Sequence, residues 1–236
     1  MKGVVTEEKQ SSSISYHNER NEVLEKHFNQ LKKKEKVYFK NYLKFPETDL
    51  LEIDRGQISD GFVQDWIDSK DVDLVVVFGT SIIKSKLVFT YHGRIINLHL
   101  GLSPYYRGSG TNIWPFYYSE PECIGATFHL ITQKIDGGPI LFQLRPEIKK
   151  HDDIYEIGNK TIFHAGMAIG DVLKAYFLKR LIPKSQIGTG KICLKKNFNE
   201  IIINEIFKNF SSGMIKHYLD NKIEKDHNKP IINTFE

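Results

Sequence analysis

The segment Asn97-Leu-His-Leu-Gly carries an amide and an imidazole side chain two residues apart, on Asn97 and His99. They end an apolar run, residues 94–99, that is typical of a buried strand, and side chains two apart on a strand point to the same face. Ligands of open α/β sheets bind outside the carboxyl ends of strands. An amide offers a neutral donor and acceptor, and an imidazole exchanges a proton near neutral pH. The pair indicates either a proton-transfer site or polar residues that merely end a strand, and the residues alone leave both readings open.

A carboxylate follows later in the chain, on the tight turn Asp136-Gly137-Gly138. If this turn lies near the strand end, Asp136 can orient His99 or take up its positive charge. A loop that contains Pro104 and Gly108 follows His99 directly. Such loops are typical walls of a binding site, so we expect the substrate to meet the chain there.

Other familiar chemistry is absent from the sequence. It contains no P-loop and no G-x-S-x-G motif, and Gly108-Ser-Gly110 lacks the third glycine of a dinucleotide fingerprint. The two cysteines, Cys123 and Cys193, are too few for a four-thiolate zinc site. The run His151-Asp152-Asp153 is typical of a loop that caps a helix. We therefore expect no metal site.

Apolar periodicity predicts the elements that position these residues. It predicts strands at residues 2–6, 73–78, 94–99, 125–131, 139–143 and 191–195. It predicts helices at residues 19–34, 61–69, 154–178 and 200–210. The alternation favours an α/β fold with a largely parallel sheet. We expect a boundary near Lys179 between a main domain, residues 1–178, and a small C-terminal strand and helix appendage, residues 179–236.

Composition limits the class of protein. The chain has 236 residues, of which 40% are hydrophobic and 26% charged, as in ordinary globular proteins. No apolar run approaches the roughly 18 residues that span a bilayer, and the N-terminus has no apolar signal segment. We expect a cytoplasmic protein with no membrane partner. The net charge of +4 is concentrated at the two ends of the chain, without a basic stripe interleaved with aromatics, so we expect no nucleic-acid partner.

Four short motifs occur in a specific order. They are Asn97-x-His99, Leu102-Ser-Pro-x-Tyr-Arg-Gly108, Gly125-Ala-Thr-x-His129 and Ile135-Asp-Gly-Gly-Pro-Ile140. Together they resemble the folate-dependent formyltransferase family, which includes phosphoribosylglycinamide, methionyl-tRNA and nucleotide-sugar formyltransferases. The resemblance runs from about Asp73 to Gln143 and continues more loosely to Leu178. It implies a Rossmann-like sheet and formyl transfer from N10-formyltetrahydrofolate as co-substrate.

The resemblance also implies roles for single residues. Asn97, His99 and Asp136 match the family's catalytic set. In that reaction a primary amine attacks the formyl carbon and generates an oxyanion, and a well-placed donor lowers the barrier by roughly 3–4 kcal/mol. Asn97 would be such a donor, and Asp136 would hold His99. His99 would either donate as imidazolium or manage the amine proton, and the sequence leaves both open.

Two further groups of residues follow from the same resemblance. The pterin ring would lie between a strand-end loop and a facing loop, with contacts from Ser81, Ile82, Ile83, Thr132, Gln133 and Ile135. Plain core packing is the alternative for Ile82 and Ile83. The acceptor would meet the loop after His99, at Ser103, Tyr105, Arg107 and Gly108.

The N-terminus departs from the family pattern. Family members usually begin with an additional strand and helix before the segment that matches residues 2–8. We therefore expect a sheet that lacks the usual first strand and helix, with an exposed edge or another segment in the vacant place. The missing unit carries phosphate contacts in some relatives. Either the chain is natively short or its true start lies upstream of Met1, and those contacts depend on which of the two holds.

Three acceptors compete on the sequence. The Tyr106-Arg107-Gly108 ending of the loop and the strand-rich segment 190–194 favour the amino group of a nucleotide-linked sugar. The Gly-Gly-Pro after Asp136 also fits the purine-pathway enzyme, and a degenerate, non-catalytic member is a further alternative. Only 58 residues follow Leu178, too few for the RNA-binding barrel of the tRNA enzyme. The apolar helix face Ile201, Ile202, Ile206 and Phe210 must dock on a second copy, which we favour as a homodimer, or on its own chain.

Overall fold

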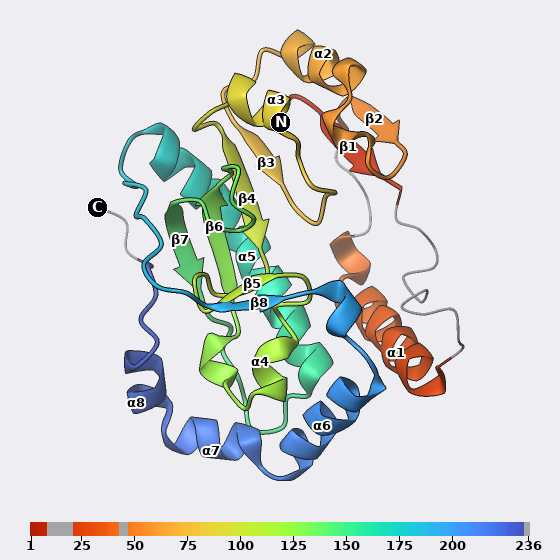
Figure 1. Ribbon diagram of the computed structural model, residues 1–236, viewed down its shortest axis with the longest axis vertical. Helices are drawn as coiled ribbons and strands as arrows, with labels where there is room; N and C mark the ends of the chain where they lie inside the picture. Colours follow the sequence, from red (N-terminus) through yellow and green to blue (C-terminus); the bar gives the residue numbers. More distant parts are fainter. Residues whose placement is uncertain (9–20, 43–46, 234–236) are drawn as a thin grey trace.

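The computed structural model describes residues 1–8, 21–42 and 47–233 (Figure 1). Its strands are β1 Val4–Glu7, β2 Leu50–Ile53, β3 Val75–Val77, β4 Ile95–His99, β5 Tyr106–Gly108, β6 Ala126–Leu130, β7 Ile140–Leu144 and β8 Lys191–Cys193. Its α-helices are α1 Glu22–Tyr38, α2 Gly61–Ser69, α3 Ser85–Thr90, α4 Trp114–Tyr117, α5 Ile154–Phe177, α6 Glu200–Ser211, α7 Met214–Asp220 and α8 Lys222–His227. Every predicted element overlaps one of these, whereas β2, β5 and the four short helices were not predicted. None of the helices in these ranges is long and apolar enough to cross a membrane.

A four-stranded sheet in the order β3-β4-β6-β7 occupies the centre of the molecule. Strands β3 and β4 run parallel, whereas β4 pairs antiparallel with β6, and β6 with β7. The prediction of a largely parallel sheet is therefore wrong for this sheet. The short connection through residues 136–138 is one physical reason, because a parallel partner for β6 would need a crossover of about a dozen residues.

Helix α5 lies behind this sheet in Figure 1. It begins at the N-cap Asp153, whose carboxylate accepts hydrogen bonds from the backbone N–H groups of Tyr155 and Glu156. Its buried side chains pack with Ile96 and Leu98 of β4 in one apolar cluster, whereas Ile95 belongs to a different cluster. Because side chains alternate along a strand, Asn97 and His99 share the face of Ile95.

Residues 179–236 fold back on the rest of the chain. Strand β8 pairs in parallel with β5, and α6 packs against α1 and α4. Ile202 and Ile206 are buried there in one cluster with Phe28 and Trp114, whereas Ile201 is 68% exposed. The chain itself covers the apolar face of α6, so this face does not require a second subunit, and Ile201 does not belong to it.

Strands β1 and β2 form a separate parallel pair. Val5 and Leu51 pack with β3 and β4 in one apolar cluster, but within the described ranges no strand ladder joins β1 to β3. The carboxylate of Glu7 accepts hydrogen bonds from the backbone N–H of Gly56 at 2.9 Å and of Ser81 at 2.7 Å. Glu7 therefore holds the loop after β3 in place at the edge of the sheet. The expected absence of a preceding strand and helix stays a prediction.

Candidate active site

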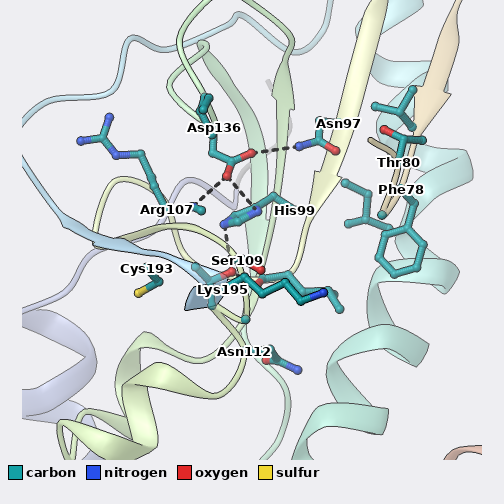
Figure 2. Close-up of a pocket in the computed structure, with 18 of the residues that line it drawn as sticks. Phe78, Thr80, Asn97, His99, Arg107, Ser109, Asn112, Asp136, Cys193 and Lys195 are labelled. Atoms are coloured by element: carbon teal, nitrogen blue, oxygen red, sulfur yellow. Dashed lines mark hydrogen bonds and ion pairs between the residues drawn. The ribbon is translucent and has the colours of Figure 1, made fainter. Parts of the chain in front are cut away.

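The structure brings Asn97, His99 and Asp136 together at the carboxyl end of β4 (Figure 2). Asp136 Oδ1 lies 3.3 Å from Asn97 Nδ2, and Asp136 Oδ2 lies 3.6 Å from His99 Nδ1. The turn between β6 and β7 places the carboxylate there, with Asp136 itself in the left-handed region at φ 45°. A residue in that region carries backbone strain of about 1 kcal/mol or more, which persists only where its surroundings hold it.

Gly108 supplies a third contact to the carboxylate. Its backbone N–H donates to Asp136 Oδ2 at 2.9 Å. Gly108 has φ +99°, and a Cβ at this position would lie 2.2 Å from the carbonyl oxygen of Cys193 on the paired strand β8. Only glycine tolerates both the positive φ and the close approach of this carbonyl. The β5–β8 pairing and the contact to Asp136 therefore both depend on Gly108.

His99 is a buried ring with one nitrogen committed to the protein. Its Nε2 lies 3.3 Å from the carbonyl oxygen of Tyr106 and 3.2 Å from the hydroxyl of Thr111, which itself donates to the carbonyl of Leu100. These two acceptors place the hydrogen on Nε2. Burial lowers the pKa of His99 against the opposing attraction of Asp136. The ring is then neutral near pH 7, and Nδ1, on the Asp136 side, is the atom that can take up a proton.

Asp136 stays ionised in this setting. Burial alone would raise the pKa of its carboxyl, but the Gly108 N–H and the attraction of the His129 and His99 rings in their protonated forms lower it on balance. A carboxylate that keeps its charge can stabilise an imidazolium beside it. The pair can therefore receive a proton at His99 Nδ1 without leaving an unbalanced buried charge.

His129 is a fourth residue of the cluster. It lies directly opposite Asn97 in the β4–β6 register and is 2% exposed. Its Nδ1 lies 2.9 Å from the carbonyl oxygen of Leu130 and must donate to it, which leaves Nε2 as an acceptor for Asn97 Nδ2 at 3.1 Å. Asp136 Oδ1 is farther from this nitrogen, at 3.7 Å. His129 thus holds one N–H of Asn97, and the other N–H faces Asp136.

A cavity of about 1370 Å³ opens over this cluster. All six residues that the sequence assigned to the pterin line it: Ser81, Ile82, Ile83, Thr132, Gln133 and Ile135. Ile82 is 74% exposed and Ile135 is 66% exposed, so core packing does not explain Ile82. Ile83 is partly buried against the cluster under β3 and serves both as packing and as cavity wall.

The loop after His99 divides into two halves. Arg107 and Gly108 line the cavity, and their contact with the acceptor stays a prediction. Ser103 and Tyr105 do not line it. Ser103 is fully buried, with its backbone N–H bonded to the hydroxyl of Thr127, and the Tyr105 hydroxyl donates to the carbonyl of Pro230 in the tail. Ser103 and Tyr105 therefore lie outside this cavity, because the sheet buries Ser103 and the tail contacts Tyr105, and their predicted contact with substrate finds no support in its lining.

Within the residues described, no group of three or more His, Cys, Asp and Glu side chains is arranged to hold a metal ion.

The family assignment rests on the match of a family model described as formyl transferase, which covers residues 4–173. The chain belongs to the formyl transferase family. The match covers more than half of the chain and includes every residue of the cluster around Asp136.

Among the relatives of this chain is phosphoribosylglycinamide formyltransferase from Haemophilus influenzae, 32% identical over 103 residues, which are 43% of this chain and 48% of that protein. The first curated relatives are each matched over less than half of their own length.

Two solved structures share its fold. A sugar N-formyltransferase from Shewanella sp. has a TM-score of 0.55 at 18% identity, covering 89% of this chain and 87% of that one. A formyltransferase from Anoxybacillus kamchatkensis, solved with UDP-4,6-dideoxy-4-formamido-L-AltNAc and tetrahydrofolate, has a TM-score of 0.54 at 20% identity, covering 69% and 80%.

Several residues around the cavity have no role predicted from the sequence. His129 belongs to the motif Gly125-Ala-Thr-x-His129, but only the β4–β6 register places it opposite Asn97. His27, Asn112 and Lys195 also line the cavity. Their positions carry no motif, and only the packing of α1, of the loop after β5 and of the tail brings them there.

Proposed function

We propose that this formyltransferase transfers a formyl group from N10-formyltetrahydrofolate to the primary amine of a nucleotide-linked amino sugar. The observation that carries the proposal is the Asp136 carboxylate, within 3.3 Å of Asn97 and 3.6 Å of His99 on the wall of one large cavity. The Anoxybacillus structure holds a formamido-sugar nucleotide and tetrahydrofolate, and the Shewanella protein is a sugar N-formyltransferase. Both support this acceptor class.

The part of the cavity lined by residues 81–83 and 132–135, here called the folate half, fits a flat, partly apolar ring. Ile82 and Ile135 present exposed side chains to the cavity from two loops, and exposed apolar groups that face a cavity are typical of ligand walls. Ser81 is held by Glu7 through its backbone N–H, which fixes the first of these loops. When bound, the folate supplies a formyl carbon that an amine can attack.

In that attack Asn97 would donate a hydrogen bond and His99 would transfer a proton. As the amine nitrogen bonds to the formyl carbon, negative charge develops on the formyl oxygen. The Asn97 N–H that His129 does not hold donates to Asp136 at 3.3 Å and would be shared with that oxygen. A single such donor contributes roughly 3–4 kcal/mol. His99 accepts the amine proton at Nδ1, beside Asp136, and returns a proton to the folate N10 as the old C–N bond breaks. The neutral ring of His99 favours this proton-transfer role over that of a resting imidazolium.

His129 would be a positioning residue in this scheme. It holds the other N–H of Asn97 at 3.1 Å, so the amide cannot rotate its oxygen toward the developing charge. Preorganised donors act without reorganisation during the reaction. We therefore expect His129 to affect turnover rather than folate binding.

A second acceptor deserves a test, because phosphoribosylglycinamide formyltransferase from Haemophilus influenzae is 32% identical over the matched residues. Purified protein is incubated with N10-formyltetrahydrofolate and, separately, with phosphoribosylglycinamide and with UDP-, dTDP- and GDP-linked amino sugars. We expect formamide product by mass spectrometry with a nucleotide-linked sugar alone. Product with phosphoribosylglycinamide alone would select the purine reaction. No product with any amine, while Asp136→Asn behaves as the wild type, would select a non-catalytic family member.

The organisation of the whole chain is part of the proposal. Residues 1–178 would form the catalytic domain and residues 179–236 its appendage, in a cytoplasmic homodimer. The family match to residues 4–173 supports the first. The homodimer rests on the resemblance to sugar-modifying enzymes alone, since α6 is covered within its own chain. Sedimentation tests it, and a species near 27.4 kDa would reject it.

A further inference from the structure

The cavity continues beyond the catalytic cluster into a lobe between α1 and α5. This α1–α5 lobe is lined by His27, Leu31, Glu35, Tyr155, Ile162 and Asn112. Neither the folate half nor the catalytic cluster uses these residues. The proposed chemistry needs room for a pterin and an amine, and the lobe is the part of the cavity left for the remainder of the acceptor.

One stripe of α1 forms the length of the lobe. His27, Leu31 and Glu35 are spaced four residues apart, so they lie on one face of the helix. Their exposure rises along the stripe: His27 is 1% exposed, Leu31 is half-buried and Glu35 is exposed. The lobe therefore has a closed end at His27 and an open end at Glu35.

His27 presents an unused hydrogen-bonding atom at the closed end. Its Nδ1 lies 3.2 Å from the hydroxyl of Tyr155, and burial raises the pKa of Tyr155, so this hydroxyl keeps its proton and can donate. When the Tyr155 hydroxyl donates to Nδ1, the ring hydrogen of His27 lies on Nε2, and this nitrogen is buried without a hydrogen-bond partner. Burial lowers the pKa of His27 to about 4, so the ring is neutral at pH 7. A buried N–H without a partner is rare in folded proteins and calls for an explanation.

Asn112 supplies the complementary atom. Its Oδ1 is also buried without a hydrogen-bond partner. The lobe thus combines a neutral donor on His27 and a neutral acceptor on Asn112 with apolar walls from Leu31 and Ile162. Neutral polar edges between apolar walls match a flat uncharged heterocycle. They match a phosphate or carboxylate less well, because the polar atoms of His27 and Asn112 are neutral, and the Lys34 ammonium near Tyr155 is already paired with Asp153.

Lys195 lies between the lobe and the catalytic cluster. In Figure 2 its side chain crosses the cavity between His99 and Asn112. An ammonium group on this cavity wall can contact the middle of an acceptor whose amine lies at His99 and whose heterocycle lies at His27. A diphosphate is the chemical group that gains most from such a contact. The order amine, anion, heterocycle is that of a nucleotide-linked amino sugar.

We infer that the α1–α5 lobe binds the nucleobase of the acceptor, with His27 Nε2–H donating to a ring carbonyl or nitrogen and Asn112 Oδ1 accepting from the base. Lys195 faces the diphosphate. This inference rests on the proposed function for the position of the amine, and it adds the residues that select the nucleotide.

Calorimetric titration of the wild-type protein with UDP, dTDP, GDP and CDP tests the site without any turnover. We expect one of these diphosphates to bind. His27→Leu removes the donor and should weaken that binding about tenfold, as expected for one lost hydrogen bond. His27→Gln, which keeps an N–H donor, should recover part of it. His92→Leu, the same change at an exposed position outside the cavity, is the matched control and should bind as the wild type.

Tetrahydrofolate, titrated into the same samples, separates the two proposals. If tetrahydrofolate binds and no diphosphate does, or if His27→Leu binds the diphosphate as the wild type does, the nucleobase site is wrong and formyl transfer to another amine still stands. If a diphosphate binds at His27 but tetrahydrofolate does not, the proposed function fails and the site survives. Should His27→Leu not fold, Asn112→Ala takes its place, and unchanged diphosphate affinity in that variant overturns the inference.

Discussion

Asp136 is the residue on which the cluster converges. Its carboxylate contacts the Asn97 amide and the Gly108 N–H and faces the His99 ring. Removing it would leave His99 without a counter-charge and Asn97 with one contact fewer. Because Asn97 lies near a strand end and Asp136 on a turn, the loss of either side chain opens no cavity in the core.

We predict that His99→Ala and Asp136→Asn each lower kcat by more than about tenfold, since each removes the proton acceptor or its counter-charge. The thermal midpoint should stay within a few degrees of the wild type. Steady-state kinetics and thermal unfolding on the same preparations check both points. Near-full turnover in either variant would show that the altered residue has no part in the reaction.

His129 yields a sharper test because it acts only through Asn97. His129→Leu frees the Asn97 amide to rotate, and we expect kcat to fall by about one to two orders of magnitude. His129→Gln offers an oxygen in place of Nε2 and should recover part of the loss. The KM for the folate should stay within about twofold, because no pterin-lining residue changes. A rise in KM with kcat unchanged would contradict the positioning role.

His27 on helix α1 lines the cavity and also makes the free energy of unfolding depend on pH. The pKa of His27 falls from 6.5 to about 4 on burial. Between these values the unfolded chain binds a proton at His27 and the folded chain does not, so stability is present above about pH 6.5 and falls as the pH falls toward 4. A difference of this size corresponds to roughly 3 kcal/mol.

We therefore expect the wild type to lose up to roughly 3 kcal/mol more unfolding free energy than His27→Leu between pH 7 and pH 4. Urea unfolding of both proteins at several pH values measures it. The His92→Leu variant, altered at an exposed site, should follow the wild type. Parallel pH curves for the wild type and His27→Leu would show that His27 titrates normally in the folded chain.

At the scale of the whole molecule, the tail is part of the core. Ile203 and Tyr218 are almost fully buried in the cluster that also holds Tyr106 and Phe116 from the predicted main domain. Strand β8 pairs with β5, which carries Gly108. Residues 179–236 therefore complete the hydrophobic core, and through β8 they hold the strand that carries Gly108.

Deletion of residues 184–236 should abolish cooperative thermal unfolding, because it uncovers this cluster and removes the partner of β5. A chain that lacks only residues 234–236 serves as the control and should unfold as the full chain does. Circular dichroism during heating checks both. If the shortened chain unfolds cooperatively near the midpoint of the full chain, residues 1–183 fold independently, and the predicted boundary near Lys179 would separate true domains.

The sequence by itself determined what is local. The two-residue spacing of Asn97 and His99 implied a shared face, since alternation is a property of any strand. The glycines after Asp136 implied a tight turn that presents its carboxylate. The apolar periodicity of α5 and the N-cap at Asp153 were also visible, because a helix and its cap depend on neighbours within four residues.

Only the tertiary structure decided the contacts between distant segments. The antiparallel register that places His129 opposite Asn97, and the tail that covers Tyr105, join residues far apart in the chain, and no local pattern encodes which strand pairs with which. His27 shows the difference most clearly. Its helix spacing is the same whether it fills a core or lines a cavity, and the packing of α1 on α5 made it a cavity wall with an unused N–H.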